Sequence, residues 1–282
     1  MSYKTIVIHL DTGPRCALRV DLAAGLAAAH GSHLVGIAAT GRPDVIVTMN
    51  SAVPDHVEGV ALSAAYLRER AAELARSFER QCVAAGVSSY EARVVDDAAL
   101  DAVVRHGRCS DLVVVGQTDR RSGPFGVEGV ATDFPQQVLL HSGAPVLLVP
   151  CAGAFRHVGR RALVAWKDTR EAARALRDAL PMLRSAERVV LLEIGEAGTR
   201  PSAEGAFDAA RAWLASHGVA ADARFETSAI DIGDELLSRA ADLDADLIVM
   251  GGYGRSRVRE WVLGGATRHL LAQMTAPTLM SH

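Results

Sequence analysis

A glycine-rich stretch in the second half of the chain has the composition of a phosphate-binding turn. Met250-Gly-Gly-Tyr-Gly254 is followed by nine residues, Arg255 to Leu263, and then by Gly264-Gly-Ala-Thr267. Glycine tolerates positive φ and lets an anion approach the backbone closely. The first amides of a helix have no partner within that helix, so they also attract phosphate. The stretch therefore predicts a phosphate site, although its spacing is neither that of the P-loop nor that of the GxGxxG turn.

The elements that position this turn occur twice in the chain. Asp111-Leu-Val-Val-Val-Gly116 returns as Asp246-Leu-Ile-Val-Met-Gly251. Each copy is followed by Ala-Pro and a short apolar run, Ala144–Val149 and Ala276–Met280. One repeat covers nearly half of the chain, which indicates a duplicated domain and not a solenoid of short repeats.

Strands and helices alternate within each repeat, and this predicts an α/β fold. Continuous runs of β-branched residues and leucine are typical of strands buried on both faces. Their alternation with helical segments predicts a doubly wound parallel sheet in each half. We expect one domain over residues 1–154 and a second over 155–282. The predicted strands cover residues 5–10, 33–39, 89–95, 111–116, 146–149, 162–166, 188–194, 221–227, 246–251 and 278–281. The predicted helices cover residues 15–30, 60–85, 97–108, 131–141, 169–183, 202–217, 232–243 and 265–274.

Each repeat ends in an apolar strand, which would leave unpaired backbone groups at the edge of a sheet. We expect residues 146–149 and 278–280 to be paired or covered. The partner is either the other half of the same chain, which makes an internal pseudo-dimer, or a second chain, which makes a homodimer.

The Gly-x2-Gly-x9-Gly spacing of residues 251–264 resembles the nucleotide-phosphate signature of the universal stress protein family. Residues 246–251 are similar to the fourth strand of that family, and the resemblance to its tandem bacterial members extends over both halves. It implies Rossmann-like, five-stranded parallel sheets with the strand order 3-2-1-4-5. It also implies dimeric assembly and the binding of ATP or another adenine nucleotide, with Mg²⁺ on the phosphates as an option.

The resemblance implies a nucleotide site built from the glycine turn, the start of the following helix and the residues after the second half's first strand. These candidates are Gly251, Gly252, Gly254, Arg255, Gly264, Gly265, Ala266, Thr267, Trp166, Lys167 and Asp168. No catalytic residue and no resident metal ligand is assigned.

Two positions depart from the family pattern. The family places Ser or Thr directly after the third glycine, where this chain has Gly265, and Thr267 lies two positions further on. The family also places Asp at the end of the first strand, where we align Lys167; an alignment that matches Asp168 to Asp11 stays open. Losing two hydrogen bonds to a charged group, at about 1.5–3 kcal/mol each, would weaken a ~1 μM site to ~0.2 mM or beyond. A chain without any nucleotide is therefore an alternative.

The first half keeps Asp11 but has lost the glycines. Gly116 is followed by Gln117-Thr-Asp119, so a carboxylate stands where the second glycine belongs and would repel a phosphate. We interpret this half as a degenerate copy that does not bind ATP.

Composition excludes several classes of function. The net charge is −3, so there is no basic excess for binding nucleic acid. No apolar run is long enough for a membrane span, and the first residues do not resemble a secretory signal, so we expect a cytoplasmic protein. The four cysteines form no CxxC pair or Cys/His cluster, which favours free thiols.

The function expected from these residues is that of a non-enzymatic stress-response protein with a regulatory nucleotide site in its second half. His9 beside Asp11 could act as a general base, but no nucleophile accompanies the pair. The alternatives are a nucleotide-free adaptor and a weak ATPase.

Overall fold

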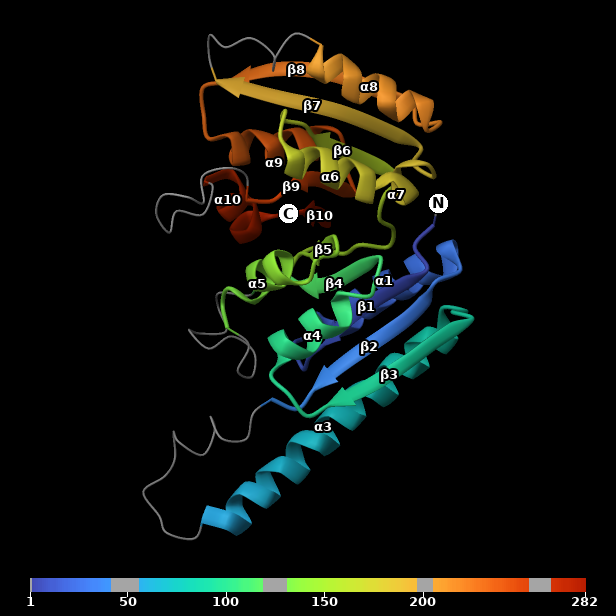
Figure 1. The fold of residues 1–282 in the computed structure, drawn as a ribbon, viewed down its shortest axis with the longest axis vertical. Coiled ribbons are helices and arrows are strands. Elements are labelled where there is room, and N and C mark those ends of the chain that lie inside the picture. The colour runs from blue at the N-terminus through green and yellow to red at the C-terminus, as the bar shows by residue number, and fades with distance from the viewer. Residues whose placement is uncertain (1, 42–55, 119–130, 197–204, 254–264) are drawn as a thin grey trace. The chain divides into compact units, whose positions relative to one another are not determined.

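The computed structural model describes residues 2–41, 56–118, 131–196, 205–253 and 265–282. The chain divides into two compact units. The N-terminal unit comprises Tyr3–Ala144, and the C-terminal unit comprises Pro145–His282 together with the first two residues. Figure 1 shows the elements of both units.

The N-terminal unit contains four parallel strands. They are β1 (Thr5–Leu10), β2 (His33–Ala39), β3 (Ser89–Val95) and β4 (Leu112–Gly116), in the order β3-β2-β1-β4. Its helices are α1 (Cys16–His30), α3 (His56–Ala84), α4 (Ala99–Gly107) and α5 (Phe134–His141). Helix α1 packs against α3, and α4 packs against α5. This is the pairing that right-handed crossovers on the two faces of a parallel sheet require.

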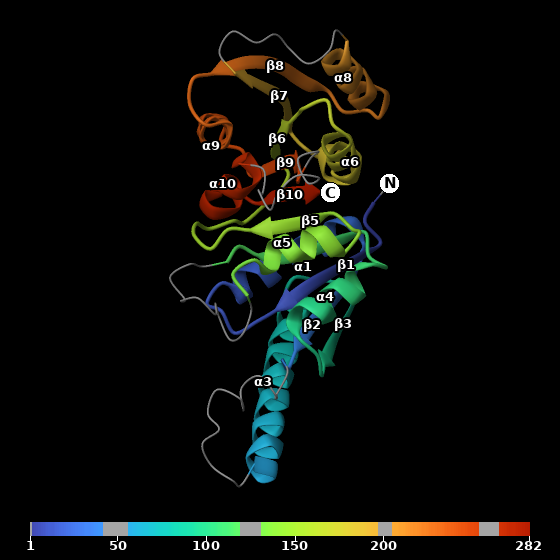
Figure 2. The ribbon, with the colours of Figure 1, turned by 60° about the vertical axis from the view of Figure 1, so that its left-hand side comes forward.

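The C-terminal unit contains the predicted five-stranded parallel arrangement in full. Its strands are β6 (Arg161–Ala165), β7 (Arg188–Glu196), β8 (Ala221–Ser228), β9 (Leu247–Gly251) and β10 (Thr278–Ser281), in the order β8-β7-β6-β9-β10. The helices are α6 (Arg170–Asp178), α7 (Leu180–Leu183), α8 (Ala206–Ser216), α9 (Ile232–Asp242) and α10 (Gly265–Gln273). Helices α6 and α8 lie on one side of the sheet, and α9 and α10 on the other (Figure 2). The predicted α/β class and the strand order 3-2-1-4-5 are confirmed.

The helix predicted over residues 169–183 is two helices. Helix α6 ends at Asp178, and the four-residue helix α7 follows Ala179. Pro181 is the physical reason, because it has no N–H to donate to the carbonyl of Arg177 and its ring crowds the preceding turn.

Several helices end at the predicted glycines. Gly31, Gly86 and Gly218 have φ values of 62°, 71° and 79°, in the left-handed region. At Gly31 the backbone N–H donates to the carbonyl of Ala27, which closes the last turn of α1.

The last strand of the first repeat pairs with the last strand of the second. Strand β5 (Val146–Val149) runs antiparallel to β10, with Leu147 opposite Leu279. This contact places β5 in the C-terminal unit, although it belongs to the first repeat. The prediction that the two terminal strands are paired is therefore confirmed, and of its two alternatives the structure shows pairing within one chain. The division of the repeats at residue 154 stays a prediction.

Two further observations limit the chemistry of the chain. All four cysteines are free. Within the described residues, no helix combines the length and apolar character that crossing a membrane requires.

Candidate functional site

The predicted site residues of the C-terminal unit meet where the order of its strands reverses. From β6 the chain continues to β7 on one side, whereas β9 continues to β10 on the other. Strands β6 and β9 pair directly, with Ala165 opposite Met250. Trp166 and Gly251 are therefore neighbours at the carboxyl ends of the two strands. In open α/β sheets ligands bind outside the strand ends at such a reversal.

The strand register identifies the residue that corresponds to Asp11. Strand β1 pairs with the first residue of β4 through Ile6, and β6 pairs with the first residue of β9 through Ala162. Five positions further along each strand stand Asp11 and Lys167, which agrees with the alignment of these two residues. Lys167 and Asp168 are both exposed.

Gly251 is required by the packing of helix α6. A Cβ atom on Gly251 would lie 2.6 Å from the backbone nitrogen of Ala172 and 2.7 Å from the carbonyl carbon of Glu171. Distances this short do not occur for real Cβ atoms, so only glycine lets α6 approach the end of β9 this closely. The glycine that we predicted for phosphate binding thus has a structural role as well.

The amide of Gly252 is used inside the sheet. It donates to the carbonyl of Ser281 at 2.8 Å, while the carbonyl of Gly252 lies 3.2 Å from Nδ1 of His282. Tyr253 follows with a φ of 54° and is only 4% exposed. The turn therefore folds back over the end of β10, and the Gly252 amide does not face outward toward a phosphate.

The other predicted phosphate-binding residues that the structure describes lie at the start of helix α10. The helix begins at Gly265, continues through Ala266 and buries Thr267. Gly254, Arg255 and Gly264 lie outside the described residues.

A donor and an acceptor near the reversal have no hydrogen-bond partner among the described residues. The first is Nε1 of Trp166, which is buried although the residue as a whole is half-buried. The second is Oε2 of Glu171, whose residue is 2% exposed. Burial favours a higher pKa for Glu171, but the Arg170 guanidinium and its own backbone amide outweigh this effect and hold the pKa below its usual value. The sequence analysis missed Glu171, because an acidic residue in the first turn of a helix is ordinary.

The corresponding place in the N-terminal unit is occupied by an internal ion pair. Asp11 accepts hydrogen bonds from the amide of Gly13 at 2.8 Å and from Nη2 of Arg19 at 2.6 Å. Arg19 is 3% exposed and also donates to the carbonyl of His9. Burial would raise the pKa of Asp11, but Arg19, His9 and the Gly13 amide keep it below its usual value.

Arg19 also occupies the space beside Gly116, the counterpart of Gly251. A Cβ atom on Gly116 would lie 2.4 Å from Nη1 of Arg19. The space beside this glycine is therefore filled differently in the two units. The Arg19 guanidinium fills it in the N-terminal unit, and the backbone of α6 fills it in the C-terminal unit. Asp119, which we predicted to repel phosphate, lies outside the described residues.

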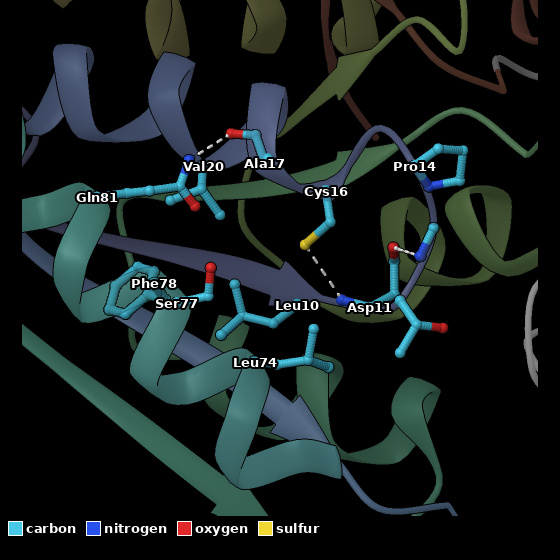
Figure 3. Close-up of a pocket in the computed structure, with 12 residues that line it drawn as sticks. Leu10, Asp11, Pro14, Cys16, Ala17, Val20, Leu74, Ser77, Phe78 and Gln81 are labelled. Atoms are coloured by element: carbon cyan, nitrogen blue, oxygen red, sulfur yellow. Dashed lines mark hydrogen bonds between the residues drawn. The ribbon is translucent and has the colours of Figure 1, made fainter.

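A pocket of about 200 Å³ opens in the N-terminal unit beside the carboxyl end of β1 (Figure 3). It lies between the end of β1, the start of α1 and the C-terminal part of α3. The lining residues include Asp11, Cys16, Ser77 and Gln81 among apolar side chains. No pattern in the sequence indicates this pocket, because it depends on how α3 packs against α1.

Comparison with known proteins identifies the second half. Residues 159–282 match the universal stress protein family. A universal stress protein from Archaeoglobus fulgidus DSM 4304 is 13% identical, with a TM-score of 0.74, over 98% of this chain and 97% of its own. A protein from Pseudomonas aeruginosa UCBPP-PA14 that is assigned to the universal stress proteins is 16% identical, with a TM-score of 0.58, over 99% of this chain and 93% of its own. No curated protein matches the chain in sequence.

At these identities the solved structures show a fold shared over the whole chain, in agreement with the strand order. The sequence match places residues 159–282 in the universal stress protein family.

Proposed function

We propose that the C-terminal unit binds an adenine nucleotide as a regulatory ligand. The observation that carries the proposal is the meeting of the β6 and β9 carboxyl ends at the reversal of strand order, with α10 starting nearby in the chain. Helix α10 has nine residues, so its first amides carry the partial positive charge that attracts phosphate.

The polar groups around the reversal suit such a ligand. Trp166 Nε1 is a donor and Glu171 Oε2 an acceptor without partners among the described residues. An adenine ring offers ring nitrogens to the first and an amino group to the second. The exposed side chains of Lys167 and Arg170 add positive charge beside the strand ends, where phosphates would gather.

The polar groups at the reversal of the N-terminal unit are paired with one another. Both oxygens of Asp11 are engaged by Gly13 and Arg19, and Arg19 fills the space beside Gly116. This supports the interpretation of the first half as a copy that does not bind nucleotide.

A nucleotide-free adaptor is the second candidate. The Gly252 amide already donates to Ser281, and Gly251 is explained by its contact with α6 alone. Both glycines are thus compatible with a turn that has only a structural role. A cytoplasmic location, and assembly as a homodimer or as an internal pseudo-dimer, belong to our proposal in either case.

Calorimetry of the full chain decides between the two. Titration with ATP and Mg²⁺, and with AMP, should give one site per chain. Gly254→Asp should abolish this binding, because it places a carboxylate in the glycine turn. Gly25→Asp is the matched control, since Gly25 is exposed on α1 and a Cβ there meets no atom within 4 Å. Absence of heat at millimolar ATP, with no nucleotide released from the purified protein, would favour the adaptor.

A further inference from the structure

Three side chains that can ligate a metal converge between helices α9 and α10. Asp231 precedes α9, Asp234 lies in its first turn, and His269 lies in α10. One ligand atom from each of the three lies within 4.8 Å of the other two. Gly233 makes the approach possible, because a Cβ there would lie 2.9 Å from Oδ1 of Asp231 and 3.0 Å from Cδ2 of His269.

The imidazole of His269 faces a carboxylate inside this cluster. Its Nε2 atom lies 2.7 Å from Oδ1 of Asp234. The Nε2 atom is buried, although the side chain of His269 as a whole is one-quarter exposed.

The two carboxylates are unusual in the C-terminal unit. Most of its acidic side chains pair with arginine, as Glu226 and Glu235 do with Arg239. Within the described part of the chain, neither Asp231 nor Asp234 has an arginine or lysine partner. His269 is the only base that faces them there. Two adjacent negative charges without a cation attract a metal ion.

One of the carboxylates is already fixed in place. Asp231 caps α9, and its Oδ1 accepts the amide of Gly233 at 2.7 Å. Its other oxygen has no partner among the described residues, so it is free to ligate while the cap stays formed. Capping thus orients Asp231, as a hydrogen bond to a metal ligand commonly does.

We propose that Asp231, Asp234 and His269 bind a divalent transition metal of the Zn²⁺ type. One imidazole and two carboxylates are ligands that zinc takes at about 2.0–2.2 Å, and a tetrahedral ion holds such atoms about 3.4 Å apart. The three ligand atoms, which now lie within 4.8 Å of one another, must move to that distance when the ion binds. Three protein ligands leave the remaining position to water. The ion links α9 to α10, and its binding does not depend on a nucleotide.

The test uses the full chain without nucleotide. Zn²⁺ titrated by calorimetry should bind once per chain, and Co²⁺ should give the visible absorption of a site with nitrogen and oxygen ligands. His269→Ala should weaken Zn²⁺ binding at least about tenfold and remove the cobalt spectrum, because it deletes a ligand. His157→Ala makes the same change at an exposed position of the same unit and should bind like the parent chain.

A conservative variant guards against loss of the fold. Asp231→Asn keeps an oxygen that caps α9 but removes the ligand charge, so it should retain the melting temperature of the metal-free chain and lose affinity for Zn²⁺. Zn²⁺ should raise the melting temperature of the parent and not that of His269→Ala. Equal Zn²⁺ affinity in the parent and His269→Ala, sulfur charge-transfer bands in the cobalt spectrum, or no Zn²⁺ binding by the parent would each overturn the proposal.

Discussion

His9, Asp11 and Arg19 form a group of titratable residues inside the N-terminal unit. Nδ1 of His9 lies 3.5 Å from Oδ2 of Asp11, and its ring packs against Phe134 with the ring centres 4.7 Å apart. The pKa of His9 is lowered to about 4, chiefly by burial; Asp11 opposes the shift and Arg19 adds to it. His9 is therefore neutral in the folded chain at ordinary pH, and its role as a general base has no support beyond its position beside Asp11.

The lowered pKa of His9 predicts that stability is lost on acidification. As pH falls below about 6.5 the unfolded chain takes up a proton at His9, whereas the folded chain does so only near pH 4. Between pH 7 and pH 5 this single group costs about 2 kcal/mol of unfolding free energy. Urea unfolding at the two pH values measures the loss.

His9→Gln is the control for that measurement, because glutamine does not titrate. It should remove most of the difference between the two pH values. The slope that remains belongs to groups such as His30 and His106, whose pKa values are also lowered by burial. An unchanged pH dependence in His9→Gln would contradict this account.

Gly251 offers a second prediction at the level of one residue. Gly251→Ala should destabilise the C-terminal unit by about 1–3 kcal/mol, because its methyl group would overlap the backbone of α6. Gly25→Ala is the matched change in α1, where a Cβ meets no atom within 4 Å, and it should stabilise by about 0.5–1 kcal/mol. Denaturant unfolding of both variants gives the two signs. If both variants changed the unfolding free energy equally, the contact of Gly251 with α6 would not be what makes glycine necessary there.

The sequence predicted which residues stand at the strand ends, but not what they contact. Gly251, Trp166 and Lys167 follow from the repeat and from the periodicity of strands. The contact of Gly251 with α6 and the burial of Arg19 do not, because they depend on the approach angle of a helix. No local pattern in the sequence encodes that angle, and a buried arginine looks like a surface one until its partner is known.

Helix α6 connects the candidate site to the rest of its unit. Its N-terminal cap is Thr169, whose Oγ1 accepts the amide of Ala172 at 3.3 Å. The same amide is the atom closest to the position of a Cβ on Gly251. The cap, the glycine and the end of β9 thus form one junction.

Removing the cap should loosen that junction. Thr169→Ala should lower the unfolding free energy by about 1 kcal/mol, since the amide of Ala172 loses its side-chain acceptor. Thr169→Ser keeps the hydroxyl and should retain nearly all of the stability. Guanidinium unfolding followed by circular dichroism measures both, and a loss in Thr169→Ser equal to that in Thr169→Ala would assign the effect to packing of the methyl group.

The bounds of the strands were predicted better than the break within a predicted helix. All ten strands lie within two residues of their predicted bounds, because buried parallel strands have continuous apolar runs. The break between α6 and α7 was missed, although Pro181 is a recognised cause of such breaks. The pocket beside β1 depends on the packing of α3 and had no counterpart in the sequence pattern.

At the scale of the whole molecule, the repeats and the compact units do not coincide. Strand β5 ends the first repeat but pairs with β10 of the second. The sequence predicted that both strands would be covered, since their apolar runs could not remain as open edges. It left open whether the cover comes from the same chain or from another.

Two fragments test the contribution of β5. Residues 145–282 keep β5 beside β10 and should be monomeric, whereas residues 155–282 leave the edge of β10 unpaired and should self-associate. Sedimentation velocity over a range of concentrations distinguishes the two. A monomeric 155–282 fragment would show that the edge of β10 tolerates solvent.

The antiparallel pairing of β5 and β10 also does not depend on the protein concentration. Both strands belong to one polypeptide, so each meets the other at an effective concentration in the millimolar range, whatever the amount of protein present. Their association is a first-order event that low abundance in a cell would not reverse. Any assembly that responds to ligand or protein level must therefore use another surface than this pair of strands.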